Sequence, residues 1–423
     1  MSFGWSRDRW EEYLFDRVGQ PLANAVVYQA KGKTIAKVWS EQRERFKRIA
    51  QKNAGVNDAE VIQKALDVGG KVFIAKGTYI CSQTIKMKDV VVEFEKGVEL
   101  KLGNGVNADL IQVAGTVVLK GEVILNGNNA NNGSGILINA YDSIEKLVVD
   151  GLTLKYYPER GIRALETLTH NKVVIRNCKI YYSETLPEHK AGGWAISGKS
   201  EYLLVENCEM INIPNDAINY FGDIIRISNN TIKNTPDGGL HVAPISESAE
   251  IVVEDNHIEN VQSNKGIGVG TDDSSVNLYN ARVVNNYIKD VGDYSAIRMQ
   301  YAYECIIEKN IIDGCPDGIV IALEGSGNTI ANNRIRNITG TGIYARNNDN
   351  VIEGNVIDSP NNGIQLYNAY DNIVVGNRVK NAANIGIYEQ SGDYNVIVAN
   401  NVRGSATGIS TVGTNTVSAN NIT

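Results

Sequence analysis

Residues 318–344 read GIVIALEGSGNTIANNRIRNITGTGIY and contain the pattern that decides the fold. Short runs such as Asn328-Thr-Ile-Ala alternate polar and apolar residues, which is typical of strands that are buried on one face. The Gly318-Ile319 pair that opens the stretch returns as Gly342-Ile343. A unit of about 22 residues therefore holds two or three short strands.

The unit recurs along most of the chain in two interleaved series. One series is a Gly or Ala followed by Ile or Leu, and it runs from Gly135-Ile136 to Gly408-Ile409. The other is an asparagine shortly before Ile or Val, found at Asn177, Asn207, Asn230, Asn256, Asn286, Asn310, Asn333, Asn355, Asn377, Asn401 and Asn421. The unit is too short for a propeller blade and lacks the spacing of a leucine-rich repeat. One turn of a single-stranded parallel β-helix fits it, with successive strands stacked about 4.8 Å apart.

Both series have a physical reason in a β-helix. An inward asparagine at each turn can bond its amide to the asparagines of the coils above and below, which satisfies polar groups that are costly to bury. The Gly or Ala lies where a turn re-enters a strand and bulk is excluded. We therefore predict a ladder of stacked asparagines inside the solenoid.

An amphipathic helix is predicted over residues 57–67, before the first coil. Its apolar residues, among them Ile62 and Leu66, have helical spacing, and Asn57 is the candidate N-cap. A helix at this point would cover the open end of the solenoid, which terminal repeats require.

Residues 56–85, VNDAEVIQKALDVGGKVFIAKGTYICSQTI, resemble the entry segment of the pectate-lyase-like superfamily. The likeness consists of the helix with the pattern D-x-x-x-I-Q-x-A-L-D, the Gly pair and the following V-x-x-x-x-G-T-Y. It implies an all-β, right-handed parallel β-helix over residues 54–423. Fold alone does not define activity, because the superfamily includes polysaccharide lyases, glycoside hydrolases, mannuronan epimerases and phage tailspikes.

The first fifty residues differ from the rest in charge, with ten Lys/Arg and six Asp/Glu. Residues 15–42, FDRVGQPLANAVVYQAKGKTIAKVWSEQ, resemble a module found near the N-termini of phage tail fibres and tailspikes. Short strands are expected at residues 25–28 and 35–39. Residues 1–53 are accordingly expected to form an attachment or oligomerisation segment, which implies a homotrimer joined to virion tail or baseplate proteins. The alternative is a cap that packs on the β-helix.

Composition narrows the partners and the compartment. The net charge of −7 argues against nucleic acid as the main partner, and no apolar stretch is long enough to span a membrane. No signal peptide is visible, so a virion or an extracellular location is expected. The five cysteines lack zinc spacing and are interpreted as buried thiols. Asp272-Asp273 could hold calcium, but we expect neither a metal nor a cofactor.

The outward positions beside each Gly-Ile pair are expected to form files along the solenoid. They carry aromatic, amide and cationic side chains. These suit an extended anionic polysaccharide, because tyrosine rings stack on sugars and arginine binds carboxylates. An ordinary solvated face would be richer in lysine and glutamate. The candidate polysaccharide-binding residues are Arg163, Asn219, Tyr344, Gln365, Tyr367 and Tyr388.

The candidate catalytic residues are Asp216, Asp237, His241, Arg298 and Glu324. The residues leave two mechanisms open. In an elimination or epimerisation, His241 removes the proton beside a uronate carboxylate that Arg298 neutralises. In a hydrolysis, two carboxyl groups drawn from Asp216, Asp237 and Glu324 act as acid and base or nucleophile. The structural alternative is that these aspartates are ordinary turn residues.

Together these features predict a tailspike-like, receptor-binding protein that recognises a cell-surface polysaccharide, with depolymerisation left open. One alternative is a free polysaccharide lyase, glycoside hydrolase or uronate epimerase. Another is a structural or adhesive fibre without catalysis. The residues do not name the sugar or its linkage.

Overall fold

The computed structural model describes residues 25–40, 45–53, 57–128, 135–185, 187–271, 276–358 and 360–423. The chain divides into two compact units, Met1–Ile180 and Tyr181–Thr423. Residues 1–24, which open the predicted attachment segment, and the calcium candidate Asp272-Asp273 lie outside the described residues. None of the helices described is long and apolar enough to cross a membrane.

The first unit begins with the antiparallel hairpin that the sequence predicts. β1 (Ala25–Ala30) pairs with β2 (Lys33–Ser40) around a two-residue turn. Lys31 and Gly32 in this turn have positive φ angles of 49° and 68°, which suit a tight hairpin. β3 (Arg45–Asn53) adds a further antiparallel strand that the sequence analysis missed.

The predicted helix is present as α2 (Ala59–Leu66), with its apolar face buried. The N-cap is Asp58 rather than Asn57. The fully buried Asp58 carboxylate does not cap the helix; it accepts hydrogen bonds from the Thr34 hydroxyl and from the backbone N–H of Ile80, at 2.6 Å. The start of the helix is therefore held by the contacts of Asp58 with Thr34 and Ile80. These residues are distant in sequence, so the local pattern does not show the contacts.

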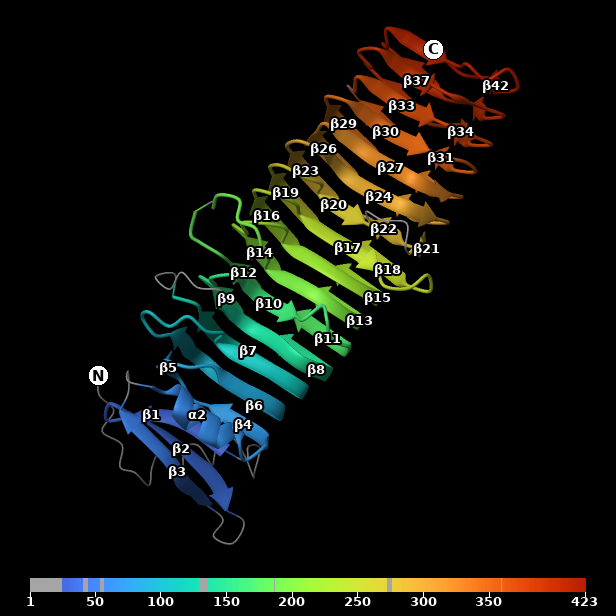
Figure 1. Ribbon diagram of the computed structural model, residues 1–423. Helices are drawn as coiled ribbons and strands as arrows, with labels where there is room; N and C mark the ends of the chain where they lie inside the picture. The colour runs from blue at the N-terminus through green and yellow to red at the C-terminus, as the bar shows by residue number, and fades with distance from the viewer. Residues whose placement is uncertain are drawn as a thin grey trace. The chain divides into compact units, whose positions relative to one another are not determined.

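Parallel strands form the coils of the first unit (Figure 1). β1 pairs in parallel with the first of them, so the hairpin is continuous with the first coil. β6, β7 and β8 pair in parallel over most of their length. The strands are β4 (Gly70–Ile74), β5 (Gly77–Cys81), β6 (Ile85–Leu102), β7 (Ile111–Asn126), β8 (Ile136–Asp150), β9 (Thr153–Lys155), β10 (Arg160–Ala164) and β11 (His170–Arg176). β12 (Lys179–Tyr181) lies at the boundary of the two units.

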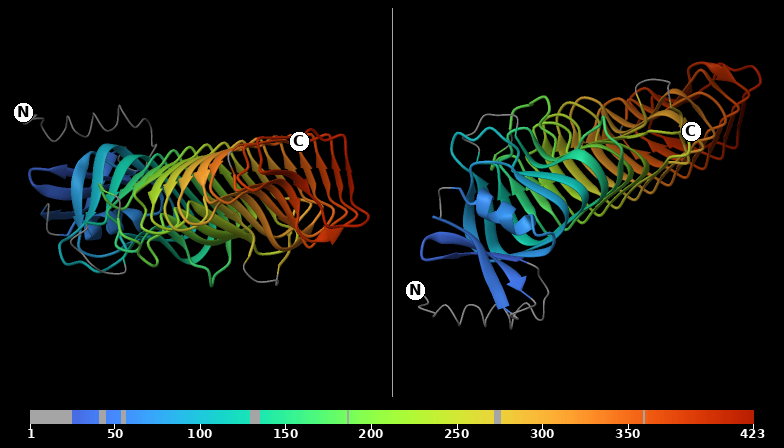
Figure 2. Two further views of the ribbon diagram at one scale, coloured as in Figure 1. Left: turned by 90° about the horizontal axis from the view of Figure 1, so that it is seen from above. Right: turned by 60° about the horizontal axis from the view of Figure 1, so that its bottom comes forward.

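The second unit is a parallel β-helix in which successive coils contribute strands to three sheets (Figure 2). We call the sheet that carries the candidate site residues sheet 1. Its strands are β13 (Ile196–Glu206), β15 (Ile218–Ser228), β17 (Leu240–Pro244), β20 (Ile267–Val269), β24 (Ser295–Tyr303), β27 (Asp317–Ser326), β30 (Thr341–Arg346), β33 (Asn362–Tyr367), β37 (Ile385–Glu389) and β41 (Thr407–Ser410).

Sheet 2 comes next in each coil, and long strands such as β15 take part in both sheets. Its other strands are β18 (Glu250–Glu254), β22 (Arg282–Val284), β25 (Ile306–Glu308), β28 (Thr329–Ala331), β31 (Val351–Glu353), β35 (Ile373–Val375), β39 (Val396–Val398) and β42 (Val417–Ala419). The short strand β21 (Leu278–Tyr279) pairs instead with the end of β24. A separate small pair is formed by β34 (Ala369–Tyr370) and β38 (Gly392–Asp393).

Sheet 3 completes each coil. Its strands are β14 (Glu209–Ile211), β16 (Thr231–Thr235), β19 (His257–Val261), β23 (Tyr287–Val291), β26 (Ile311–Cys315), β29 (Arg334–Ile338), β32 (Val356–Asp358), β36 (Arg378–Lys380) and β40 (Asn401–Arg403).

The predicted alternation is confirmed on β15, where Ile218 and Tyr220 are buried while Asn219 and Phe221 face outward.

The predicted asparagine ladder is confirmed, with corrections at both ends. It consists of Asn230, Asn256, Asn286, Asn310, Asn333, Asn355, Asn377, Asn400 and Asn421, whose side-chain amides bond each other at 2.9–3.1 Å. Asn177 and Asn207 are turn residues with positive φ, and Cys208 takes the inward position beneath Asn230. Asn400, not Asn401, is the ladder residue, because the turn residue with positive φ is Ala399.

A second, shorter ladder was not predicted. It lies at the turns between sheet 1 and sheet 2, whereas the longer ladder lies at the turns between sheet 2 and sheet 3. It consists of Asn328, Asn350, Asn372 and Asn395. It too begins beneath an inward cysteine, Cys305, whose N–H donates to Asn328. The five cysteines are free and buried, as expected.

The small residue before each inward Ile is required by packing. At Gly318 a Cβ atom would lie 2.3 Å from the carbonyl oxygen of Gly342 in the next coil. Such a distance is far below van der Waals contact, so this position excludes larger residues. The predicted exclusion of bulk is thereby confirmed.

Candidate functional site

The outward positions of sheet 1 form one file in the second unit. In each strand the residue after the inward Ile or Leu pairs in register with its counterpart on the next strand. From β13 to β37 this central file consists of Ser197, Asn219, His241, Gly268, Arg298, Val320, Tyr344, Gln365 and Tyr388. Strand pairing therefore places most of the predicted site residues on one surface.

Asp216 lies at the start of the central file and is buried, with 7% of its surface exposed. Its Oδ2 accepts a hydrogen bond of 3.2 Å from Nδ2 of Asn219, and the backbone N–H of Gly238 in the next coil also donates to its carboxylate. Loss of hydration and the nearby charge of Asp237 raise the pKa of Asp216 to about 6. The group is thus protonated in mildly acidic solution.

Asp237 is the more accessible of the two carboxylates, with 25% of its side chain exposed. Its Oδ1 accepts a hydrogen bond of 3.0 Å from Asn264, and its Oδ2 lies 3.5 Å from Nε2 of His189. Because Asp237 interacts electrostatically with Asp216, we call Asp216 and Asp237 the carboxylate pair. His189 was missed by the sequence analysis, because it lies between β12 and β13 and outside the repeat.

Lys265 acts on the carboxylate pair, and His241 lies in the central file beside Asn219. Lys265 is buried and lies across Gly268, where a Cβ atom would come within 2.4 Å of its Cε. The charge of Lys265 offsets part of the rise in the pKa of Asp216. Nε2 of His241 lies 3.1 Å from the carbonyl oxygen of Gly270. Since a carbonyl can only accept, this contact assigns the proton to Nε2.

The acceptor role of Asp216 recurs at two other turns. Oδ1 of Asp317 accepts a hydrogen bond of 2.6 Å from the backbone N–H of Thr341. In the first unit, Oδ1 of Asp109 accepts one of 3.0 Å from the N–H of Ile136. All three aspartates lie two residues before an inward Ile. Part of the role of Asp216 is therefore to join successive coils, and the second carboxylate beside it distinguishes this turn from the others.

Arg298 and Glu324 are not brought to the carboxylate pair. Arg298 is on β24, three strands from β15, which is about 14 Å at the usual strand spacing. Its guanidinium lies 5.2 Å from the ring centroid of Tyr294. Glu324 is exposed near the end of β27, one strand further on, where its charge raises the pKa of Tyr303 in addition to burial. The structure does not form the predicted groupings of Glu324 with either aspartate.

An aromatic patch lies further along sheet 1, formed by Tyr344, Arg346 and Tyr367. The two tyrosine rings are stacked with centroids 6.3 Å apart and planes inclined by 24°. The guanidinium of Arg346 lies 4.9 Å from the ring centroid of Tyr367. Burial raises the pKa of Tyr344. The patch combines aromatic surface with a fixed positive charge.

Gln365 lies beside the aromatic patch in the central file, with its amide already engaged. Its Oε1 accepts hydrogen bonds of 3.2 Å from the Thr341 hydroxyl and from Nδ2 of Asn362. Its Nε2 donates to Gln390 at 2.6 Å. The half-buried Tyr388 follows in the file. A sugar hydroxyl would therefore meet a preformed polar network rather than a mobile amide.

Arg163, the remaining predicted binding residue, belongs to the first unit. Its Nη2 lies 3.2 Å from Oε2 of Glu166, whose other oxygen is 2.8 Å from Arg160. Burial opposes ionisation of Glu166, but hydrogen bonding and the two arginines hold its pKa below the usual value.

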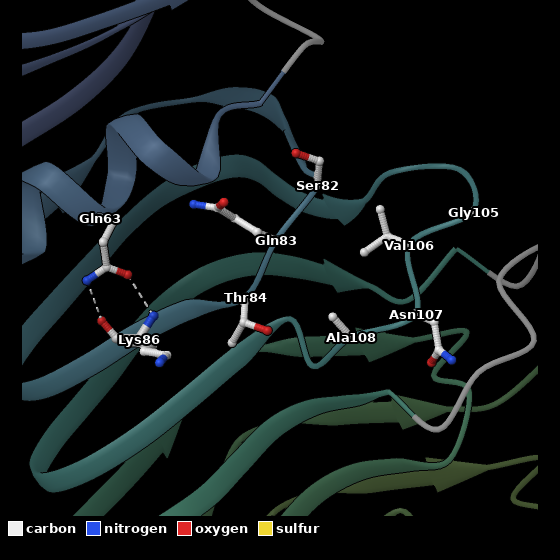
Figure 3. Close-up of a pocket in the computed structure, with 9 residues that line it drawn as sticks. All are labelled: Gln63, Ser82, Gln83, Thr84, Lys86, Gly105, Val106, Asn107 and Ala108. Carbon is white, nitrogen blue, oxygen red and sulfur yellow. Dashed lines mark hydrogen bonds between the residues drawn. The ribbon is translucent and has the colours of Figure 1, made fainter.

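A pocket of about 720 Å³ also lies in the first unit (Figure 3). Gln63 of α2 forms two hydrogen bonds with the backbone of Lys86, at 2.9 and 2.8 Å, so its amide takes the place of a neighbouring strand. The pocket is lined by Gln63, Ser82, Gln83, Thr84, Lys86, Gly105, Val106, Asn107 and Ala108. None of the predicted site residues lines it.

Family comparisons match two stretches of the chain. Residues 110–288 match the family described as "Right handed beta helix region". Residues 275–423 match the family described as "Periplasmic copper-binding protein (NosD)". A comparison with curated protein sequences finds no match.

Solved structures resemble the chain over most of its length. The Azotobacter vinelandii mannuronan C-5 epimerase AlgE4 A-module is 15% identical and has a TM-score of 0.50, covering 86% of this chain and 97% of that one. The pre-mature bacteriophage phi29 gene product 12 is 14% identical and has a TM-score of 0.55, covering 86% of this chain and 56% of that one. The chain thus has a right-handed parallel β-helix fold, as the sequence resemblance predicts.

The residues that match the copper-binding family do not suit copper. Residues 275–423 contain no histidine, and their two cysteines and single methionine are buried. No three His, Cys, Asp or Glu side chains in the described part of the chain come close enough to hold a metal ion.

Proposed function

We propose that the chain is a tailspike-like protein that binds an extended cell-surface polysaccharide along the central file and hydrolyses it at the carboxylate pair. The observation that carries this proposal is the position of Asp216 and Asp237 on adjacent coils, at one end of a file of aromatic, amide and cationic side chains. A chain lying along the coils would contact both features.

Binding is supported by the aromatic patch and by Arg298. Tyrosine surface packs on the apolar faces of sugar rings, while guanidinium groups bond hydroxyl and carboxylate oxygens. Arg346 and Arg298 each lie against a tyrosine ring, which limits their motion before the sugar arrives. Less conformational entropy is then lost on binding.

Hydrolysis is supported by the different environments of the two carboxyl groups. Asp216 keeps its proton up to about pH 6, and Asp237 is the group exposed to solvent. A coupled pair that holds one proton can protonate the leaving glycosidic oxygen while the ionised carboxylate takes a proton from water. His189 beside Asp237 would orient that carboxylate.

Elimination or epimerisation through His241 is less well supported. Nε2 of His241 donates to the Gly270 carbonyl, so a proton could be accepted only at Nδ1 in this arrangement. Arg298, which would neutralise the substrate carboxylate, lies two strands away on β24. Both groups would have to move before they could act together on one sugar.

A binding protein without catalysis is the second candidate function. The recurrence of the same turn geometry at Asp109 and Asp317 favours it, because a purely structural role explains those two aspartates. The names of the structural neighbours include both an enzyme acting on mannuronan and a phage protein, so likeness of fold does not choose between the candidates.

The test is incubation of the full chain with a panel of bacterial surface polysaccharides. We expect new reducing ends without the absorbance of unsaturated uronates. Asp237→Asn should lower the rate by about a hundredfold or more while binding is retained. Tyr367→Ala should weaken binding by about tenfold, and Tyr370→Ala, on the separate β34–β38 pair, serves as its control.

Other outcomes separate the candidates. Unsaturated uronates would show elimination and overturn the assignment of the carboxylate pair. Binding without cleavage across the panel would support the second candidate. Absence of binding to every polysaccharide would contradict both.

A further inference from the structure

Opposite charges alternate along one file of sheet 3 in the second unit. From β16 to β40 this charged file consists of Lys233, Glu259, Lys289, Asp313, Arg336, Asp358, Lys380 and Arg403, in strand register. Glu259 lies 3.1 Å from both Lys233 and Lys289, and Asp313 lies 2.7 Å from Arg336. Cross-strand ion pairs thus neutralise the first part of the file.

The alternation fails in the last coils. Lys380 is followed by Arg403, so two positive charges are neighbours. The adjacent outward file adds Arg334 and Arg378, which lie on either side of Val356. Both arginines are exposed, and neither guanidinium group has an ion-pair or hydrogen-bond partner within the described part of the chain. The result is a local excess of positive charge on a chain whose net charge is negative.

A groove of about 340 Å³ is lined by four basic side chains, one carboxylate and two apolar side chains: Arg334, Arg336, Arg378, Lys380, Asp358, Ile335 and Val356. Val356, with 38% of its surface exposed, gives the groove an apolar strip between two cations. Arg334 and Arg378 are two strands apart, which is about 10 Å along the solenoid and about the length of two sugar units in an extended chain. We call Arg334, Val356, Arg378 and Lys380 the basic groove.

We propose that the basic groove binds an acidic polysaccharide whose carboxylate or sulfate groups recur on alternate sugars. Each guanidinium binds one anionic group through paired N–H donors, and Val356 packs against the apolar face of the sugar between them. Single-stranded nucleic acid fits less well, because none of the lining residues is an aromatic on which a base could stack.

This inference goes beyond the function proposed above and does not depend on it. The basic groove is on sheet 3, whereas the carboxylate pair and the aromatic patch belong to sheet 1. The two surfaces can therefore be disabled separately. A second contact with an anionic chain would hold the protein on its polymer even when the central file is empty.

The experiment measures binding of three probes to the full chain by calorimetry at low salt. The probes are a hyaluronan oligosaccharide, which has a carboxylate on alternate sugars, its neutral methyl ester and a heparin oligosaccharide. We expect one or both anionic probes to bind and the ester not to bind. Arg334→Gln with Arg378→Gln should weaken this binding about tenfold, and 0.5 M NaCl should weaken it similarly.

Matched variants make the result specific. Arg282→Gln removes an exposed strand arginine from β22 in sheet 2 and should leave affinity unchanged. Arg334→Lys with Arg378→Lys should retain most of the binding. Equal affinity of the double Gln variant and the parent would overturn the proposal. So would equal binding of the methyl ester, or tighter binding of a single-stranded DNA oligonucleotide that the double variant abolishes.

Discussion

Asp216 shows how one environment gives a carboxyl group both a structural and a chemical role. Its hydrogen bonds to Asn219 and to the N–H of Gly238 join two coils and favour the ionised form. Burial and the charge of Asp237 favour the protonated form. Burial and the charge of Asp237 outweigh the hydrogen bonds, since the pKa of Asp216 is raised overall.

The stability of the chain should carry the signature of this raised pKa. Between about pH 4 and pH 6 the folded chain holds a proton on Asp216 that the unfolded chain releases, so the free energy of unfolding falls as pH rises. Asp216→Asn removes the titrating carboxyl group, so the stability of the variant lacks this pH dependence. Relative to the variant, the parent should lose about 2 kcal/mol between pH 4.5 and pH 7.5 in urea unfolding.

Asp371→Asn, at an exposed position, is the control for Asp216 and should change stability equally at both pH values. A difference between parent and Asp216→Asn that is the same at both pH values would contradict the raised pKa. It would also remove the basis for a proton shared within the carboxylate pair.

At the scale of elements, the asparagine ladders hold the turns of successive coils together. In the longer ladder each Oδ1 accepts two hydrogen bonds, from the backbone N–H and the amide of the preceding asparagine. Each Nδ2 in turn donates to the next asparagine and to a backbone carbonyl. Every buried polar atom of the turn is thereby satisfied, which a chain of single apolar residues could not achieve.

Removing one member should therefore cost more than a typical surface change. Asn355→Ala leaves the backbone N–H and the amide of Asn333 without their acceptor, and the Ile330 carbonyl without its donor. We expect a loss of about 2–4 kcal/mol in the free energy of unfolding, measured by chemical denaturation. The exposed Asn361→Ala should cost less than about 0.5 kcal/mol. Equal losses for the two variants would show that the ladder contributes little.

The unpaired edge of β3 bears on how copies of the whole molecule associate. Among the described strands β3 pairs only with β2, which leaves nine residues with one unpaired edge. Exposed edges tend to pair with strands of other chains. This edge lies within residues 1–53, the predicted attachment or oligomerisation segment, so it is a natural contact for oligomerisation.

We therefore expect the full chain to form a homotrimer. Sedimentation equilibrium should give three times the 46.1 kDa chain mass at micromolar concentration. Arg282→Gln, which lies in the second unit, should leave that mass unchanged. A monomer at all concentrations would contradict the tailspike-like role while leaving polysaccharide binding by a single chain untouched.

Much of this organisation could be predicted from residue patterns. The parallel β-helix, the hairpin at residues 25–40 and the central file from Asn219 to Tyr388 all follow from alternation and repeat length. The errors come from positions where two residues adjacent in sequence could each take the inward place. Cys208 displaces an asparagine at the start of the ladder, and Asn400 replaces Asn401, because either residue suits the local turn. The roles of the site residues stay predictions.

The sequence repeat alone therefore defines the coil and the residues that face outward. The repeat of about 22 residues gives the coil, and the alternation with a period of two gives the outward positions. It does not define which side chains meet. The contact of His189 with Asp237, the path of Lys265 across Gly268 and the unpaired arginines of the basic groove arise from folded coils stacked in register. Those contacts join residues that are far apart in sequence, and only three-dimensional packing brings them within reach of one another.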